Sequence, residues 1–213
     1  IPDPKVSIDG YEYKSGKGYN IVQYSRSVYI PIKPFLSLAG YYIAEGHVPQ
    51  NGSCAFVLTQ SDGQILDNML SVINECGLSS SVHKDPRKPH IKNIFISGGI
   101  AFREYIKNEF GDNSHKKRIP RWILALEPSY LRIIYQSMWE GDGTIAGGSR
   151  AYYTVSSELS NNVQELLIKC GVPSSITHYI LNRKNYYKVR ELQKKTIGLS
   201  PHSRSWIEYS GLV

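Results

Sequence analysis

The sequence predicts an α+β fold made of two similar halves, because one series of patterns occurs twice in the same order. "LAGYYIAEG" (38–46) and "YQSMWEGDG" (135–143) each look like a helix that ends in an acid and a glycine. "CGLSSSVH" (76–83) and "CGVPSSITH" (170–178) each follow an amphipathic helix pattern. The copies of the two patterns are 97 and 94 residues apart, so the whole series is duplicated.

Strand and helix patterns fill both halves in the order helix, strands, helix, strands and helix. The first half is predicted to contain strands at 54–61 and 91–99 and helices at 64–75 and 100–110, the last ended by Gly111. The second is predicted to contain a strand at 151–157, a helix at 159–169 and a hairpin at 176–192 with Asn182 near its turn. The predicted units are a strand-rich extension (1–33), a first repeat (34–127) and a second repeat (128–213).

The composition is that of a globular protein, which we expect to be intracellular (in the cytoplasm, or in an organelle if eukaryotic) and not secreted. The 213 residues are 41% hydrophobic and the mean hydropathy is −0.32. No apolar run reaches the about 18 residues of a membrane span, and the start has no secretory signal pattern. Cys54, Cys76 and Cys170 lack metal-site spacing, so we expect buried thiols in a reducing compartment.

The charge favours a polyanionic partner. The chain has 25 Lys and Arg against 18 Asp and Glu, which gives a net charge of +7 and a pI near 9.2. Many of the 16 tyrosines stand beside Lys or Arg, as in "RKNYYKVREL" (183–192). Strands of this kind combine positive charge with hydroxyl donors, which suits a phosphate backbone. Charge alone would equally fit an ordinary basic protein.

Both acid-ended helices carry small residues four positions apart. These are Gly40 and Ala44 in the first helix and Ser137 and Gly141 in the second. Positions i and i+4 share one helix face. Because small residues let two backbones approach closely, we expect the two helices to pack on each other.

Such packing would bring Glu45 and Asp142 side by side at two helix C-termini, where the peptide dipoles already repel negative charge. A hard divalent cation such as Mg²⁺ would relieve this repulsion, with the backbone carbonyls of Ala44 and Gly141 as further oxygen ligands. We also expect Gly46 and Gly143 to end the helices in the left-handed conformation.

The two acid-ended patterns resemble the paired motifs of LAGLIDADG homing endonucleases in their monomeric, two-repeat form. The first copy keeps Leu38-Ala39-Gly40, and the second keeps Gly141-Asp142-Gly143. The resemblance implies αββαββα halves, a motif helix pair at the interface and a saddle of antiparallel sheets over double-stranded DNA. It implies that Glu45 and Asp142 are catalytic, hold Mg²⁺ (or Mn²⁺ or Ca²⁺ for binding) and each cut one strand, leaving short 3′ overhangs. Glu45 departs from the commoner Asp.

Further catalytic residues follow from the same resemblance. "KKRIP" (116–120) is similar to a Lys-x-x-Pro block of intein-borne members, which implies a catalytic role for Lys117; an exposed loop contacting DNA backbone is the alternative. Its counterpart in the second half is open among Lys194, Lys195 and Arg204, with Arg204 favoured. Gln60 resembles a polar active-site residue of some members. Glu140 aligns with a structural position.

Candidate DNA contacts are polar and basic residues of the strands, loops and extension. They are Lys14, Lys17, Arg26, Gln50, Asn51, Ser53, Thr59, Lys84, Arg87, Lys88, Lys92, Lys116, Arg150, Tyr152, Thr154, Arg183, Lys184, Tyr186, Lys188 and Arg190.

Two other functions stay open: a non-cutting family member, either an RNA maturase or a DNA-binding regulator, and a domain that binds polysaccharide or acidic protein. The ending "WIEYSGLV" (206–213) is similar to the junction at which the endonuclease region of an intein returns to its splicing domain. We expect such an origin, which would also account for the missing start methionine. Without the terminal splicing residues, the chain itself is not expected to splice. An intron-encoded or free-standing origin is the alternative.

Overall fold

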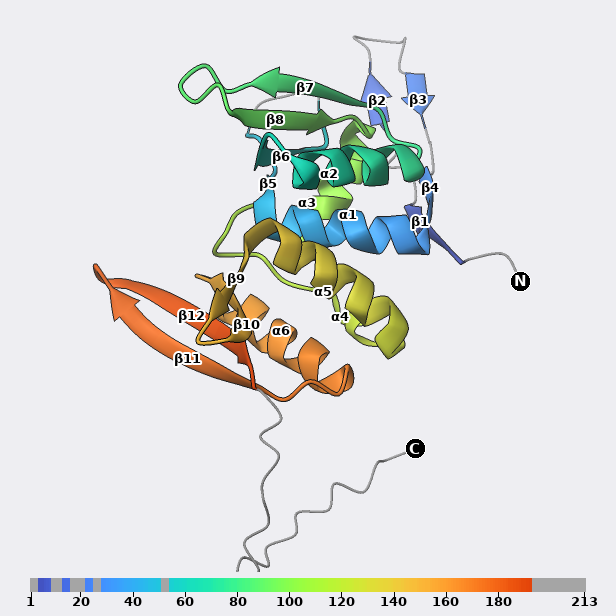
Figure 1. The fold of residues 1–213 in the computed structure, drawn as a ribbon. Coiled ribbons are helices and arrows are strands. Elements are labelled where there is room, and N and C mark those ends of the chain that lie inside the picture. The colour runs from blue at the N-terminus through green and yellow to red at the C-terminus, as the bar shows by residue number, and fades with distance from the viewer. Residues whose placement is uncertain (1–3, 9–12, 16–21, 25–27, 51–53, 193–213) are drawn as a thin grey trace, which may run out of the picture.

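The computed structural model describes residues 4–8, 13–15, 22–24, 28–50 and 54–192 (Figure 1). Its elements in chain order are β1 (Lys5–Ile8), β2 (Tyr13–Ser15), β3 (Val22–Tyr24), β4 (Val28–Pro31), α1 (Ile32–Glu45), β5 (Gly46–His47), β6 (Phe56–Ser61), α2 (Gln64–Glu75), β7 (Ser80–Lys84), β8 (Ile91–Ile96), α3 (Gly99–Phe110), α4 (Arg121–Leu124), α5 (Pro128–Asp142), β9 (Gly143–Ala146), β10 (Ser149–Thr154), α6 (Ser157–Lys169), β11 (Ser174–Leu181) and β12 (Lys184–Glu191).

The duplicated α+β architecture is confirmed. From α1 to α3 the order is αββαββα, and from α5 the described part of the second half repeats αββαββ. The β11–β12 hairpin turns at Asn182 and Arg183, whose φ angles of 50° and 61° are typical of a tight two-residue hairpin turn. No helix among the described residues is long and apolar enough to cross a membrane.

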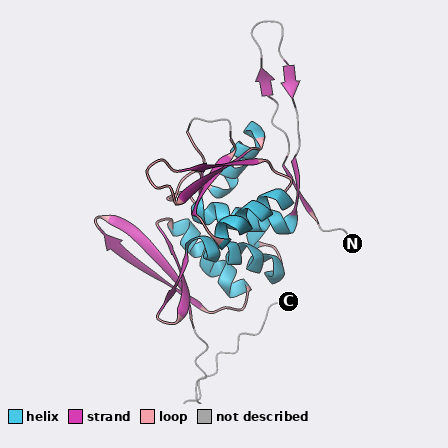
Figure 2. Ribbon diagram, turned by 45° about the horizontal axis from the view of Figure 1, so that its top comes forward, coloured by secondary structure: helices cyan, strands magenta, loops and turns pink. Residues whose placement is uncertain are grey.

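The two four-stranded sheets have the same antiparallel topology, β5-β6-β8-β7 in the first half and β9-β10-β12-β11 in the second. Gly46 lies opposite Leu58 in the first sheet, and Gly143 lies opposite Tyr152 in the second. Each sheet therefore begins at the residue that follows an acid-ended helix. The helices gather in the middle of the molecule, with a sheet on either side (Figure 2).

One face of each sheet forms the core against the helices. In the first sheet Phe56 and Leu58 are fully buried, and the Phe56 ring contacts the rings of Tyr42 in α1 and Phe102 in α3. Because side chains alternate along a strand, the residues between them point to the opposite, helix-free face. The predicted burial of the thiols holds for Cys76 and Cys170, whereas Cys54 is only partly buried.

The predicted contact between α1 and α5 is present and very close. A Cβ atom added to Gly40 would lie 2.5 Å from the carbonyl oxygen of Ile134 and 2.8 Å from Cβ of Ser137. One added to Gly141 would lie 2.6 Å from Cβ of Ala44. The two small-residue stripes thus face each other, and the separation of the helices is set by the missing side chains (Figure 1).

The prediction of left-handed glycines at the two helix ends was wrong. Gly46 and Gly143 have φ angles of −93° and −83° and extended backbones, because each is already the first residue of a strand. Glycine is needed there for space. A Cβ at Gly46 would lie 2.6 Å from the carbonyl oxygen of Tyr42, and one at Gly143 would lie 2.3 Å from that of Trp139.

We expect Gly40→Ala to destabilise the protein, although alanine normally stabilises a helix interior by about 1 kcal/mol over glycine. The new methyl group would press the α5 backbone, so the free energy of unfolding should fall by about 1–3 kcal/mol. Urea denaturation measures the change. Ser129→Ala, in the exposed first turn of α5, is the control and should change stability by about 0.5 kcal/mol or less. A higher free energy of unfolding for Gly40→Ala than for the wild type would show that the helices can move apart at little cost.

Candidate active site

Two carboxylates lie at the point where both sheets begin. Glu45 is the last residue of α1, and Asp142 is the last residue of α5. A Cβ at Gly141, the residue before Asp142, would lie 3.4 Å from Cγ of Glu45, so the close contact of the helices continues to their ends. Glu45 is partly buried, whereas Asp142 is exposed. The helix pair therefore forces two acidic residues into one place, as the sequence predicted.

The pKa values of both acids reflect this position. Burial, together with the charge of Asp142, raises the pKa of Glu45 to about 7, and Lys117 acts in the opposite direction. Burial also raises the pKa of Asp142. The site thus disfavours two uncompensated negative charges, which is the condition that a bound cation would relieve.

Lys117 lies beside this pair and is almost fully buried, at 3% exposure. Its Nζ donates a hydrogen bond to the carbonyl oxygen of Tyr42 in the last turn of α1, and it lies 3.4 Å above the centre of the Tyr42 ring. Burial lowers the pKa of Lys117 well below its usual value, and the charge of Glu45 opposes that shift. Lys117 is therefore a buried neighbour of Glu45, which the alternative of an exposed basic loop does not fit.

A cavity of about 280 Å³ opens beside Asp142 and gathers several of the predicted residues. Asp142, Ala44 and Lys117 line it together with strand residues of the second sheet. The remaining polar lining residues are Ser114, Tyr152, Tyr153, Thr154 and Tyr186. Ser114 and Tyr153 were not predicted. Tyr153 could have been found from the alternation of β10, whereas no sequence signal marks Ser114.

The donor set fits a hard divalent cation. Glu45 and Asp142 supply carboxylate oxygens, and the carbonyls of Ala44 and Gly141 belong to the last helical turns, whose carbonyls lack intrahelical partners. Among the described residues no group of three or more His, Cys, Asp or Glu side chains could hold a metal ion. Two carboxylates with carbonyls and water suit Mg²⁺ and not a zinc site.

Of the other residues predicted to be catalytic, one lies on a strand of the first sheet and the rest lie outside the described residues. Gln60, at the end of β6, folds back so that its Oε1 accepts hydrogen bonds from the Ser61 N–H at 2.8 Å and the Ser61 hydroxyl at 3.2 Å. The sheet registers give it Thr154 as its counterpart, so the two halves differ at this position. Arg204 lies outside the described residues, as do Lys194 and Lys195.

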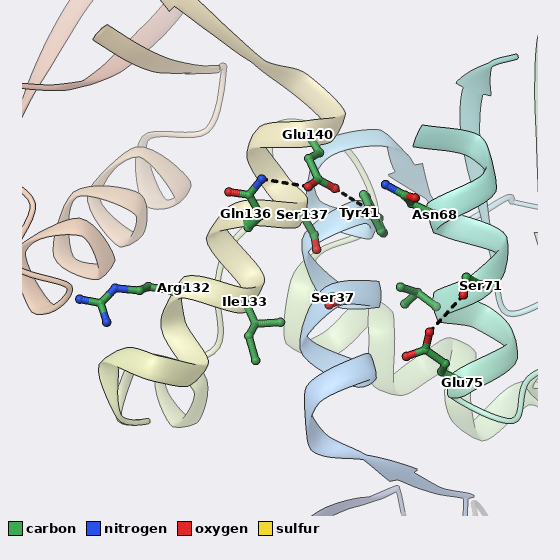
Figure 3. A pocket seen from close by; sticks show the side chains of 11 residues that line it. Ser37, Tyr41, Asn68, Ser71, Glu75, Arg132, Ile133, Gln136, Ser137 and Glu140 are labelled. Atoms are coloured by element: carbon green, nitrogen blue, oxygen red, sulfur yellow. Dashed lines mark hydrogen bonds between the residues drawn. The ribbon is translucent and has the colours of Figure 1, made fainter. Parts of the chain in front are cut away.

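Glu140 links the two motif helices, in keeping with the structural role expected for it. The Tyr41 hydroxyl of α1 donates to Oε2 of Glu140 at 2.7 Å, and Nε2 of Gln136 donates to Oε1 at 2.9 Å (Figure 3). These residues line a hollow of about 580 Å³ between α1, α2 and α5. The bond joins residues 99 positions apart and braces the helices one residue before the Gly141 contact.

The register of the second sheet places three of the predicted DNA contacts on the side of the helices. Residues directly opposite in an antiparallel pair point to the same face. Tyr152 pairs with buried Val189 and is itself 2% exposed, so it belongs to the core. Arg150 and Thr154 share its face, and the Arg150 guanidinium lies 4.2 Å from the Trp139 ring of α5. Strand alternation, and not polarity, therefore places these three residues on the helix side of the sheet.

Two predicted contacts of the first sheet are likewise on the helix side. Lys84 and Lys92 lie opposite each other, on the face of buried Ile94. Nζ of Lys92 is 3.0 Å from a carboxylate oxygen of Asp62, so its charge is locally compensated. Both lysines therefore lie away from the helix-free face of the first sheet.

The remaining predicted DNA contacts fall into three groups. On the helix-free faces of the sheets lie Thr59, Lys184, Tyr186, Lys188 and Arg190. Exposed in loops and turns lie Gln50, Arg87, Lys88, Lys116 and Arg183. Lys14 belongs to β2, and Lys17, Arg26, Asn51 and Ser53 lie outside the described residues.

Two DNA polymerases contain similar sequence segments. The DNA polymerase II large subunit of Thermococcus kodakarensis is 24% identical over 149 residues, which are 68% of this chain and 8% of that protein. A DNA polymerase of Thermococcus hydrothermalis is 26% identical over 132 residues, or 60% of this chain and 8% of that protein. The chain therefore spans less than a tenth of the length of these relatives.

Solved structures share the fold at low sequence identity. The homing endonuclease I-DmoI, in complex with DNA and Mn, has a TM-score of 0.54 at 14% identity and covers 76% of this chain and 90% of its own. The N-terminal LAGLIDADG domain of DUF199/WhiA has a TM-score of 0.50 at 9% identity and covers 74% of this chain and 75% of its own. At such identities the likeness shows the fold alone.

The sequence profile of the LAGLIDADG-like domain matches residues 34–109 and 130–198, which is more than half of the chain. The two matched segments each contain one acid-ended helix and one of the two sheets. This chain belongs to the LAGLIDADG-like domain family in its two-repeat form.

Proposed function

We propose that the protein is a site-specific homing endonuclease that cuts both strands of a long double-stranded DNA target and leaves short 3′ overhangs. The observation that carries this proposal is the pair of acids, Glu45 and Asp142, at the ends of two helices in contact. A purely structural helix pair gains nothing from two acids that oppose the helix dipoles, one of which, Asp142, raises the pKa of the other.

Each acid has a defined part in the proposed reaction. Glu45 and Asp142 would hold Mg²⁺, which when bound activates water and stabilises the leaving 3′ oxygen. Lys117 holds the last turn of α1 through the Tyr42 carbonyl. Its ammonium form, which burial disfavours and the charge of Glu45 favours, would offset charge on a nearby phosphate. Because burial has already removed water from its amine, this compensation is stronger than at the surface.

The sheets provide the proposed surface for the DNA. The sheets begin at Gly46 and Gly143, next to the acids, so a duplex lying along both helix-free faces would pass over the site. The net charge of +7 favours this association. Both acids come from one chain, so we propose that the protein acts as a monomer.

The polymerase relatives support an origin within a host protein. Since the matched segments are 8% of each polymerase, we propose that the endonuclease is the homing part of an intein. The alternative function is that of a non-cutting nucleic-acid-binding protein, which the fold shared with the WhiA domain favours. The presence of both acids favours the endonuclease.

A plasmid that carries the uninterrupted host locus tests the proposal. With Mg²⁺ the protein should linearise this plasmid, and with EDTA it should bind without cutting. The cleaved ends, sequenced on both strands, should show short 3′ overhangs. Tight binding to the locus without cutting in Mg²⁺ would decide for the non-cutting function.

Asp142→Asn and Glu45→Gln each remove one charge while they keep the side-chain shape. Either change should slow cleavage of at least one strand by about 100-fold or more, since an amide cannot replace the charged metal ligand. Binding in EDTA should be retained or tightened, because the substitution removes a negative charge. Nicked and linear products, separated on a gel, give the rate for each strand. Normal cutting of both strands by either variant would overturn the catalytic assignment.

Lys117→Met tests the buried amine. We expect a fall of roughly 10–100-fold in the cleavage rate, because the compensating charge beside Glu45 is lost. Lys107→Met removes the same charge from an exposed side chain of α3 for which no DNA contact is predicted, and it should cut nearly as the wild type does. Thermal melts of both variants check that folding is intact. Equal rates for the two variants would limit Lys117 to a structural role.

A further inference from the structure

The two sheets can be compared position by position, because their registers match. Leu58 lies opposite Ile94 in the first sheet, and Tyr152 lies opposite Val189 in the second. The other strand partner of Leu58 and of Tyr152 is in each case the glycine that follows a motif helix. Counting outward from these pairs gives each residue of one helix-free face its counterpart on the other.

The helix-free face of the second sheet is rich in cations and tyrosines. Lys184, Tyr186, Lys188 and Arg190 alternate along β12 and share this face. Nζ of Lys188 lies 5.8 Å from the centre of the Tyr153 ring. Nη2 of Arg190 donates to a carbonyl of the β9–β10 turn at 2.9 Å, which fixes its guanidinium on the sheet. This row presents fixed positive charge to a ligand.

The corresponding face of the first sheet has a different chemistry. Asn93 stands in the place of Lys188, Phe95 in the place of Arg190 and Thr59 in the place of Tyr153. The Thr59 hydroxyl donates to Oδ1 of Asn93 at 3.0 Å, which leaves the amide N–H groups of Asn93 to face outward. The His83 ring lies against that of Phe95, with the centroids 5.3 Å apart. Among the described strand residues, this face carries no lysine or arginine.

The cations of the first half lie elsewhere. Lys84 and Lys92 are on the helix side of the sheet, and Lys92 is paired with Asp62. Arg87 and Lys88 belong to the exposed loop between β7 and β8, whose backbone is held by Oδ1 of Asp85. These charges therefore border the first sheet, whereas those of the second run along its face.

We infer that the two halves contribute unequally to DNA binding. The second sheet holds phosphates through Lys184, Lys188 and Arg190, and the first sheet reads base edges with uncharged groups such as the Asn93 amide. Lysine and arginine displace counterions from phosphates, which makes binding depend on salt. Asparagine and hydroxyl groups match the donors and acceptors of bases instead. This inference rests on the proposed function, since it presumes that DNA lies on the helix-free faces.

The salt dependence of binding to a random-sequence duplex in EDTA tests the inference. Log affinity falls with log salt, and Lys184→Gln/Lys188→Gln should make this negative slope shallower by about 2, because two phosphate contacts are lost. Lys84→Gln/Lys92→Gln removes the same charge from the helix side of the first sheet and should make the dependence on salt less steep by less than about 1. Asn93→Lys gives the first sheet the lysine that the second sheet has at position 188, and it should make the negative slope steeper by about 1.

The outcomes separate this inference from the proposed function. Equal losses in the two double variants, or no steeper slope for Asn93→Lys, would overturn the unequal division while DNA binding stands. A wild-type protein that binds no duplex would overturn both proposals. If it binds but cuts nothing, the endonuclease proposal fails, and the slopes still decide how the two sheets share the DNA.

Discussion

The contact between α1 and α5 is the constraint on which the rest of this structure depends. With glycine at positions 40 and 141, the two backbones come so close that an added methyl group would overlap main-chain or side-chain atoms of the partner helix. Each helix is followed at once by the first strand of its sheet. The same contact therefore determines the distance between the acids and the spacing of the two sheets.

This close contact also imposes an electrostatic cost at the helix ends. Glu45 and Asp142 are brought together where burial and the helix dipoles disfavour charge. The Tyr41–Glu140 hydrogen bond and the Lys117–Tyr42 bond brace the helices around them. Marginal stability at such a point is common in sites that bind charged ligands, because the ligand supplies the missing compensation.

The two halves share their backbone arrangement but differ in the side chains of their helix-free faces. Both sheets have the same strand order and register, yet Asn93 and Phe95 of one correspond to Lys188 and Arg190 of the other. The shared register keeps two surfaces aligned beside one site, while the side chains on each surface are free to differ. A pseudo-symmetric frame can in this way serve a DNA target whose two halves are not alike.

The sequence by itself determined the duplication, the order of elements, the helix pair and the two acids, because these follow from periodicity and from small residues at helical spacing. Only the tertiary structure decided which strand residues leave the core. Arg150 and Lys84 are polar but lie on the helix side, and Tyr153 faces the opposite way. A one-residue change of register exchanges the two faces of a strand, and register depends on partners distant in the chain. The conformation of Gly46 and Gly143 was decided in the same way, since the strand pairing that extends them forms with β6 and β10.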